Sequence, residues 1–262
     1  GAFTTIQSAV DISDAGDAVV VLGGTYNETV TVDTGISLIG EGSDEVTIGG
    51  GGYGIHVTGD IDNGGAATVS IDGFGFDGNS VGVRIASSTQ LSSLLINNSD
   101  FSNNATHGIG SGSGAFDLAA ISVTNSTFAN NGTGGGNGAG HIVLFGFIGD
   151  ATLTDLVIDG TTAPGTPVGG LPDNAIQIAG FMPGTYDYHK PLVMVQGYTN
   201  LSTLTATNVN LNGSSTWGPL LFIDPVASSG GDAPGAAGYP GFFDGQGGTN
   251  TLDLSGFNLT DT

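Results

Sequence analysis

The sequence contains no cysteine and almost no basic residues, and these absences exclude several classes of protein. Without cysteine the chain has no disulfides, no zinc–thiolate site and no thiol chemistry. Lys and Arg together number 2 against 24 Asp and Glu, so the net charge is −22 at pH 7. A surface of this charge repels nucleic acid, and we expect no nucleic-acid partner. No apolar run reaches the ~18 residues of a membrane-spanning helix, so we expect no membrane insertion.

Glycine is in large excess, with 49 of 262 residues, but the chain does not belong to the disordered class. It is 38% hydrophobic, and the apolar residues recur in short bursts along the whole chain. Disordered segments have too few apolar residues to bury in a core. The composition therefore indicates a folded chain with a long, thin core.

One sequence unit recurs along the chain and is the main indication of its architecture. It joins an apolar residue, a polar run, a phenylalanine and a following asparagine. Clear copies are Ile71–Asn79, Ile96–Asn104 and Val123–Asn131, and degenerate copies are Leu153–Thr161, Ala206–Ser214 and Leu254–Thr262. Phe76, Phe101 and Phe128 are 25 and 27 residues apart, and their next equivalents are Ile158, Leu211 and Leu259. The last two intervals are about twice as long, which indicates an extra coil or a long loop in each.

A second unit lies between these copies and has apolar residues at alternate positions. Its copies are Gly54–Val57, Gly82–Ile85, Gly108–Ser111, Ile142–Leu144 and Ile176–Ile178. Alternation of this kind predicts a strand with one buried face. Each repeat thus carries at least two short strands, and such repeats bury their apolar faces only by stacking on one another. The sequence predicts a solenoid.

Stacking places equivalent side chains of successive coils directly above one another, ~4.8 Å apart. We expect the three phenylalanines to form an interior aromatic stack. We expect Asn79, Asn104 and Asn131 to form a buried ladder in which each amide bonds to the next coil. Asn104 and Asn131 also begin glycosylation sequons. A buried ladder would leave both sequons unusable.

The beginning of the chain carries a family resemblance. The segment Ala2–Val10 resembles the amphipathic helix that covers the first coil of pectate-lyase-like right-handed parallel β-helix proteins, and Ala15–Tyr26 and Val32–Gly40 resemble their first two coils. The resemblance implies an all-β fold in which residues 1–262 form a single right-handed parallel β-helix. Residues 3–12 would form the cap helix, and residues 161–198 and 225–248, rich in Pro and Gly, would be projecting loops.

Two groups of residues are candidates for catalysis. Uronan lyases and epimerases of this fold, as the resemblance implies, use Arg or Lys with Tyr or His, and the chain offers only Arg84 and Lys190 as cations. His56 and Arg84 share the outward position of the second unit, so they are expected on adjacent coils, where they could bind an anionic sugar. Tyr186, His189 and Lys190 provide a possible acid, base and cation. The competing interpretation is that both groups are ordinary surface residues. His107 superficially resembles the polygalacturonase His-Gly-Ile segment, and we interpret it as part of the strand repeat.

Metal-binding patterns are weak for so acidic a chain. Asp60 and Asp62 begin a segment like a calcium loop, but the residue at its twelfth position is Ile71 where an EF-hand needs Glu. They are the candidate Ca²⁺ ligands, and Ca²⁺ is the only cofactor considered. No other cofactor is expected.

The sequence leaves two functions open. The first is a non-enzymatic structural or adhesive module of a bacterial surface or exported protein, located outside the cell, with glycans or further chain as partners. The poverty of Lys, Arg and His favours it. Because the repeat continues to Thr262, we expect self-association or further chain at the C-terminal edge. The alternative is a polysaccharide-active enzyme: a uronan lyase, a C5-epimerase or a glycoside hydrolase.

Overall fold

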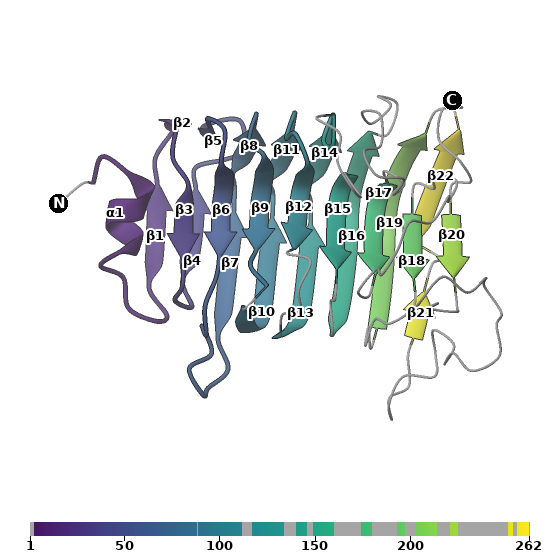
Figure 1. Cartoon of the computed structure of the whole chain (residues 1–262). Coiled ribbons are helices and arrows are strands. Elements are labelled where there is room, and N and C mark those ends of the chain that lie inside the picture. Colours follow the sequence, from purple (N-terminus) through teal and green to yellow (C-terminus); the bar gives the residue numbers. More distant parts are fainter. Residues whose placement is uncertain are drawn as a thin grey trace.

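The protein is all-β, with one short helix in the part of the chain that the structure describes. The computed structural model describes residues 3–87, 89–111, 117–133, 140–145, 149–159, 174–179, 193–196, 203–213, 221–224, 251–253 and 256–261. Figure 1 shows the strands side by side along one axis, with the helix α1 (Ile6–Val10) at the N-terminal end. Within these residues no helix is long and apolar enough to cross a membrane.

The strands form two sheets in which every pairing is parallel. The larger sheet contains β1 (Ala18–Val21), β2 (Gly24–Tyr26), β4 (Ser37–Gly40), β5 (Val46–Gly49), β7 (Thr68–Asp72), β8 (Gly75–Asp77), β10 (Gln90–Asn97), β11 (Asp100–Ser102), β13 (Asp117–Thr124), β14 (Thr127–Ala129), β16 (Asp150–Asp159), β19 (Thr203–Gly213), β21 (Thr251–Asp253) and β22 (Phe257–Asp261). The smaller sheet contains β3 (Val30–Val32), β6 (Tyr53–Val57), β9 (Val81–Ile85), β12 (His107–Ser111), β15 (Gly140–Phe145), β17 (Asn174–Ala179), β18 (Val193–Gln196) and β20 (Leu221–Asp224). From β1 to β13 each strand pairs with the strand three positions later in the chain. This order is compatible with a parallel β-helix-like fold.

The strand register confirms the predicted repeat. Phe76 pairs with Phe101, and Phe101 with Phe128. The row continues through Ile158, Leu211 and Leu259. Because Ile158 and Leu211 pair directly, no further strand stacks between them in the larger sheet. In the long interval that separates them, the smaller sheet instead gains β18, a strand that the sequence analysis did not assign.

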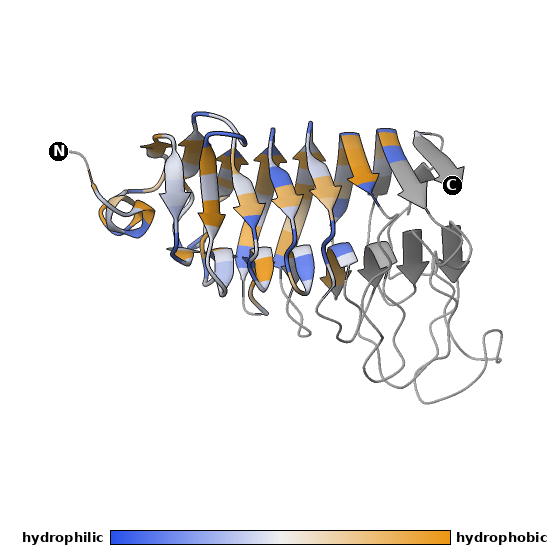
Figure 2. Ribbon diagram, turned by 90° about the horizontal axis from the view of Figure 1, so that it is seen from above, coloured by the Kyte–Doolittle hydropathy of each residue, from blue (hydrophilic) through white to orange (hydrophobic). Residues whose placement is uncertain are grey.

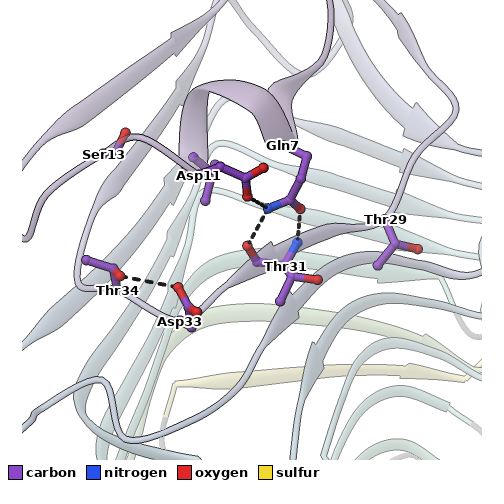
Figure 3. A pocket seen from close by; sticks show the side chains of 8 residues that line it. Gln7, Asp11, Ser13, Thr29, Thr31, Asp33 and Thr34 are labelled. Atoms are coloured by element: carbon purple, nitrogen blue, oxygen red, sulfur yellow. Dashed lines mark hydrogen bonds between the residues drawn. The ribbon is translucent and has the colours of Figure 1, made fainter.

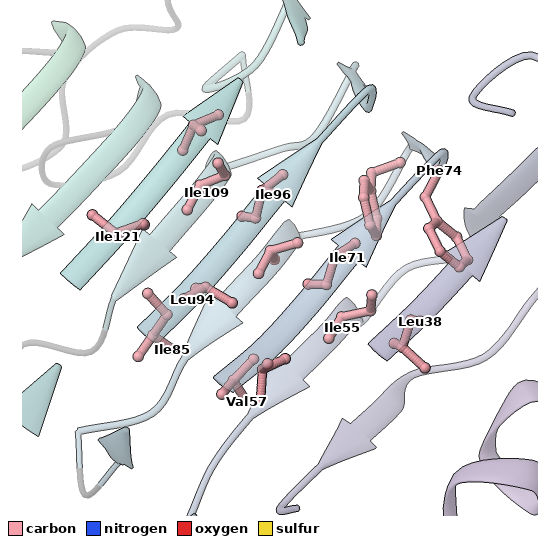
Figure 4. Close-up of a cluster of buried hydrophobic side chains, with 14 of the residues drawn as sticks. Leu38, Ile55, Val57, Ile71, Phe74, Ile85, Leu94, Ile96, Ile109 and Ile121 are labelled. Atoms are coloured by element: carbon pink, nitrogen blue, oxygen red, sulfur yellow. The ribbon is translucent and has the colours of Figure 1, made fainter. Parts of the chain in front are cut away.

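Aliphatic side chains fill the space between the sheets. Leu38, Ile71, Ile96 and Val123 form one in-register column of the larger sheet, and all four are buried. Ile55, Val83, Ile109 and Ile142 form the facing column of the smaller sheet. Figure 4 shows members of both columns gathered in one cluster of buried side chains. Figure 2 shows the matching hydropathy pattern, with apolar stretches along the strands and hydrophilic ones at the corners.

The phenylalanines form the predicted stack beside this aliphatic core. The ring centroids of Phe76 and Phe101 are 4.8 Å apart, and those of Phe101 and Phe128 are 4.7 Å apart, with nearly parallel planes. Gly82 and Gly108, at the start of the second unit, lie against these rings. A Cβ on Gly82 would lie 2.8 Å from the Phe101 ring and 2.6 Å from the Gly108 carbonyl oxygen. Glycine is therefore required there because the aromatic stack leaves no space for a side chain.

The asparagine ladder is also confirmed. The amide of Asn79 donates to Asn104 Oδ1 at 3.1 Å, and the amide of Asn104 donates to Asn131 Oδ1 at 2.8 Å. Each amide donates in addition to a backbone carbonyl, as Asn104 does to Phe76 at 3.0 Å. All three side chains are buried. The amides of Asn104 and Asn131 are thus engaged inside the protein, where a glycan could not be attached.

Tight corners explain much of the remaining glycine and asparagine. The position after β8, β11 and β14 is occupied by Gly78, Asn103 and Asn130, with φ of 69°, 54° and 54°. Only glycine and, at a modest cost, asparagine or aspartate adopt this left-handed conformation readily. The repeat therefore uses these residue types to turn the chain between strands.

The helix α1 lies inside the predicted range 3–12 but is shorter. Thr5 caps it, accepting a hydrogen bond from Ser8 N, and the Glu28 carboxylate accepts from the backbone N–H groups of Ile6 and Gln7. Ile6 and Val10 are buried, and the helix packs on β1 and β3. It thus covers the first strands of both sheets.

Candidate functional site

The outer face of the smaller sheet brings together the residues of the chain best suited to chemistry. Thr31 pairs with His56, His56 with Arg84, and Arg84 with Gly110, on strands β3, β6, β9 and β12. This register confirms that His56 and Arg84 are direct neighbours. Both side chains are partly exposed.

Tyr53, at the start of β6, completes this group. Its ring centroid is 5.0 Å from that of His56, and Arg84 Cζ is 5.7 Å from the Tyr53 centroid. An arginine at this distance from an aromatic ring is held by a cation–π attraction. One guanidinium N–H of Arg84 also donates to the carbonyl oxygen of Ser111. The guanidinium is therefore fixed from two sides.

His107 lies next to Arg84 on the following strand and is only 7% exposed. A Cβ on Gly110 would overlap the His107 ring, so the ring covers the backbone at this position. Nδ1 of His107 is buried and has no hydrogen-bond partner in the described part of the chain. We call Tyr53, His56, Arg84 and His107 the outer-face cluster.

Arg84 is the fixed positive charge of the outer-face cluster. Burial, and then the Arg84 charge, lower the pKa of His56 below its ordinary value. Burial and Arg84 together lower the pKa of His107 to about 4, although the Thr106 carbonyl opposes the change. Both imidazoles are therefore neutral at pH 7. In the described part of the chain Arg84 has two partners, Tyr53 and Ser111, and neither is a carboxylate. The cluster can thus offer one cation, the neutral imidazole of His56 and an aromatic ring to a polar ligand.

A polar pocket of about 500 Å³ lies at the N-terminal end of the same face. It is lined by Gln7, Val10, Asp11, Ser13, Thr29, Thr31, Asp33 and Thr34. Figure 3 shows Gln7 in its centre, donating to Asp11 Oδ1 at 2.7 Å and to the Thr31 carbonyl at 3.2 Å. Because Thr31 pairs with His56, the pocket is continuous with the row that contains Arg84. Hydroxyl, amide and carboxylate groups of this kind suit a neutral, polyhydroxylated ligand.

The proposed calcium ligands are engaged in the turn between β6 and β7. Asp60 Oδ1 accepts from Asn63 N at 2.9 Å. Asp62 Oδ1 accepts from Ala67 N and Ser92 N, and its Oδ2 accepts from the Ser92 hydroxyl at 2.8 Å. Among the residues with a described placement, no three His, Asp or Glu side chains gather as a metal site requires. Ca²⁺ binding at Asp60 and Asp62 stays a prediction.

Tyr186, His189 and Lys190 lie outside the described residues. Whether they approach Arg84 therefore stays a prediction. Of the residues in the outer-face cluster, sequence reasoning named His56, Arg84 and His107 but missed Tyr53. Extending the second unit by one residue would have found it, because Tyr53 pairs with Val81 and Val81 with His107.

His141 is a second buried histidine that the sequence analysis did not single out. In β15, His141 lies between Gly140 and Ile142, which pair with His107 and Ile109. It therefore lies opposite Gly108, at the position that glycine occupies in the two preceding repeats. Its Nδ1 lies 3.0 Å from the Asn131 amide nitrogen. An amide N–H can only donate, so Nδ1 accepts and the neutral ring carries its proton on Nε2. Burial lowers the pKa of His141 to about 4, against an opposing effect of Asp159.

The buried His141 predicts a loss of stability in acid. As the pH falls, the unfolded chain binds this proton near pH 6.5 but the folded protein only near pH 4. The contribution is complete above pH ~6.5 and is lost as the pH falls toward ~4, by about 2 kcal/mol between pH ~6.5 and ~4.5. Urea unfolding of the wild type and of His141→Gln across this range tests it. The difference between the two free energies of unfolding should shift by that amount, and parallel profiles would contradict the prediction.

The comparisons with known proteins leave the family open. No protein-family model, no curated protein and no solved structure matches the chain. Function must therefore be argued from the residues and their geometry.

Proposed function

We propose that the chain is a right-handed parallel β-helix that acts as a structural or adhesive module of a bacterial surface or exported protein. The regular pairing of β1 with β4, β4 with β7 and so on supports a solenoid, because each repeat then stacks on the one before it. The predominance of right-handed crossovers between parallel strands supports the hand. The resemblance at the N-terminus supports the pectate-lyase-like superfamily.

The observation that supports the structural role is that the polar repeat residues form hydrogen bonds between neighbouring repeats. Asn79, Asn104 and Asn131 are consumed in strand-to-strand hydrogen bonds inside the protein. On the surface the same pattern recurs, because Asn97 donates to Asp72 Oδ1 and Thr124 donates to Asn97 Oδ1, each at 2.8 Å. The recurring residues thus stabilise stacking, which is what a structural rod requires.

Location and partners are part of the same proposal. The charge of −22 suits an extracellular surface in saline water or one that carries Ca²⁺. A glycan is the partner that fits the polar pocket beside α1, because that pocket offers hydrogen bonds without a cation. An open edge of a solenoid presents unpaired backbone groups, so self-association through an edge is part of the proposal.

A second candidate function is a polysaccharide-active enzyme, and the outer-face cluster favours it. Arg84 could stabilise the negative charge that develops beside a sugar carboxylate, and His56 is a neutral base of suitable type. Tyr186, His189 and Lys190 would be further participants. The charge of −22 opposes this alternative, because it repels an anionic polymer.

An activity assay separates the two functions. We expect no turnover of pectate, alginate or neutral glycans in the presence of Ca²⁺. The assay follows unsaturated-uronide absorbance, new reducing ends and C5 deuterium exchange. Removing a positive charge that stabilises a transition state costs on the order of a hundredfold or more in rate. Turnover that is lost in Arg84→Ala, or in His189→Ala, but kept in the control Leu95→Ala on the other sheet, would replace the structural function with the enzyme.

A further inference from the structure

The dipeptide Asn-Gly occurs four times in the sequence, and the structure describes the side-chain surroundings of two copies, which lie in contrasting environments. Asn63-Gly64 lies in the turn between β6 and β7, which Figure 1 shows projecting beyond the strands. Asn131-Gly132 lies at the end of the asparagine ladder. The two sites share their chemistry and differ in what holds them.

The reacting groups of the exposed site, the Asn63 side chain and the Gly64 nitrogen, have no hydrogen-bond partner among the described residues, although Asn63 N donates to Asp60 Oδ1 and Gly65 N to the Asp62 carbonyl. Asn63 and Gly64 are both exposed, and Asn63 has φ of 40° in a tight turn. Among the described residues none accepts a hydrogen bond from the Gly64 N–H, and none bonds to the Asn63 side-chain amide. A Cβ at Gly64 would meet nothing within 4 Å, so the chain has room to rearrange there. The nitrogen of Gly64 and Cγ of Asn63 can therefore approach each other once the exposed turn rearranges, without breaking a hydrogen bond of either reacting group.

The buried site is restrained at both reacting groups. The Gly132 N–H donates to the Asn104 carbonyl at 2.8 Å. The Asn131 amide accepts from Asn104 at 2.8 Å and donates to the Phe101 carbonyl at 2.9 Å. Reaction there requires these hydrogen bonds to break inside the protein, where their loss is costly.

We propose that Asn63 is a site of spontaneous deamidation, and that the ladder protects the same dipeptide at Asn131. The Gly64 nitrogen, after giving its proton to water, bonds to Asn63 Cγ, and the Cγ–Nδ2 bond breaks with release of ammonia. Water then opens the cyclic imide at either carbonyl and gives aspartate or isoaspartate. One water is consumed, one ammonia leaves and one carboxylate is gained, so no oxidant or enzyme is needed. The new charge lies beside Asp60 and Asp62.

The test compares the two sites in one molecule. The intact protein is incubated in mildly alkaline buffer and then digested with trypsin. Trypsin cleaves after Arg84 and not at Lys190, which precedes Pro191, so Asn63 and Asn131 lie in different peptides. The second peptide also contains Asn137-Gly138 and Asn212-Gly213, so the conversion there must be assigned by fragmentation. Mass spectrometry measures the replacement of NH₂ by OH, and electron-transfer fragmentation assigns it to a residue and separates aspartate from isoaspartate. We expect Asn63 to convert on the order of a hundredfold faster than Asn131, which corresponds to a difference of ~2.8 kcal/mol in the barrier.

Two controls keep the proposal falsifiable. In concentrated urea both sites should convert at similar rates, because the unfolded chain removes the difference in restraint. Asn63→Gln should abolish conversion in the first peptide, since the longer side chain forms the imide slowly. Equal rates at the two sites in the folded protein, or faster conversion at Asn131, would overturn the proposal. So would an Asn63 that stays intact in the folded protein while it reacts in urea.

Discussion

Replacing Phe101 by alanine is expected to lower the free energy of unfolding by about 3–5 kcal/mol, as for other buried aromatic residues. Phe101 is 1% exposed and lies between Phe76 and Phe128, so its removal opens a gap in the middle of the stack. The neighbouring Gly82 has no side chain that could refill the gap. Stacking contacts on both faces of the ring are lost as well.

Urea unfolding followed by far-ultraviolet circular dichroism measures this loss. The matched control is Phe3→Ala, the same substitution at a ring that is 49% exposed. It should cost about 1 kcal/mol or less, because only about half of this side chain leaves water on folding and no stack is interrupted. Equal effects of the two substitutions would show that the aromatic stack contributes nothing particular to stability.

Replacing Asn104 by aspartate is expected to cost about 3–5 kcal/mol at neutral pH, the usual cost of an unpaired buried charge. The two side chains have nearly the same shape, so packing is preserved. The amide nitrogen of Asn104 donates to Asn131 Oδ1 and to the Phe76 carbonyl, however, and a carboxylate oxygen would face both acceptors. Burial would raise the pKa of the new carboxyl.

The pH dependence identifies the cause. The folded variant would hold its proton to higher pH than the unfolded chain, so the cost should shrink as the pH falls toward the ordinary aspartate pKa of ~3.9. Asn98→Asp is the matched control. Asn98 is exposed and left-handed, with φ of 48°, and the equivalent corner position two repeats later is Asp155, with φ of 52°. Its effect should stay within about 0.5 kcal/mol. A cost at Asn104 that does not change with pH would argue against a buried charge.

The repeat and its interior residues could be predicted from the sequence because they obey a strict period. Phe76, Phe101 and Phe128 occupy equivalent positions in successive repeats, and parallel strands place equivalent positions side by side. The same logic correctly linked Ile158, Leu211 and Leu259 across longer intervals.

Contacts across the core could not be predicted from the period. Gly82 is the second residue of β9, and nothing in the sequence indicates that the Phe101 ring lies against it. This contact depends on how far apart the two sheets lie. His141 is the informative exception, because it takes the position of the glycines where the aromatic row changes from Phe128 to the smaller Ile158. At this repeat glycine is replaced by the larger histidine and phenylalanine by the smaller isoleucine, so the two changes in side-chain volume compensate each other. This pair of changes could have been found in the sequence.

The candidate site was predicted in part for a similar reason. His56 and Arg84 share a repeat position, so their adjacency followed from the period. The contact between Tyr53 and Arg84 links different positions of neighbouring strands, and a long side chain that bends along the sheet creates it. Such diagonal contacts depend on rotamers, which a repeat pattern does not specify.

The asparagine ladder has a direction, and its two ends are chemically different. Each side-chain oxygen accepts from the preceding repeat. The position equivalent to Asn79 in the preceding repeat is Gly51, so Asn79 Oδ1 at the first rung is buried with no partner among the described residues. At the last rung the Asn131 amide, which has no further asparagine to bond to, donates to His141 Nδ1. A copy of an inner repeat could therefore be inserted between the rungs, since it would bring one donor and one acceptor and leave both ends intact. A copy added beyond either end would need new residues to end the ladder. Whole repeats are therefore added or removed most easily between the first and last rungs.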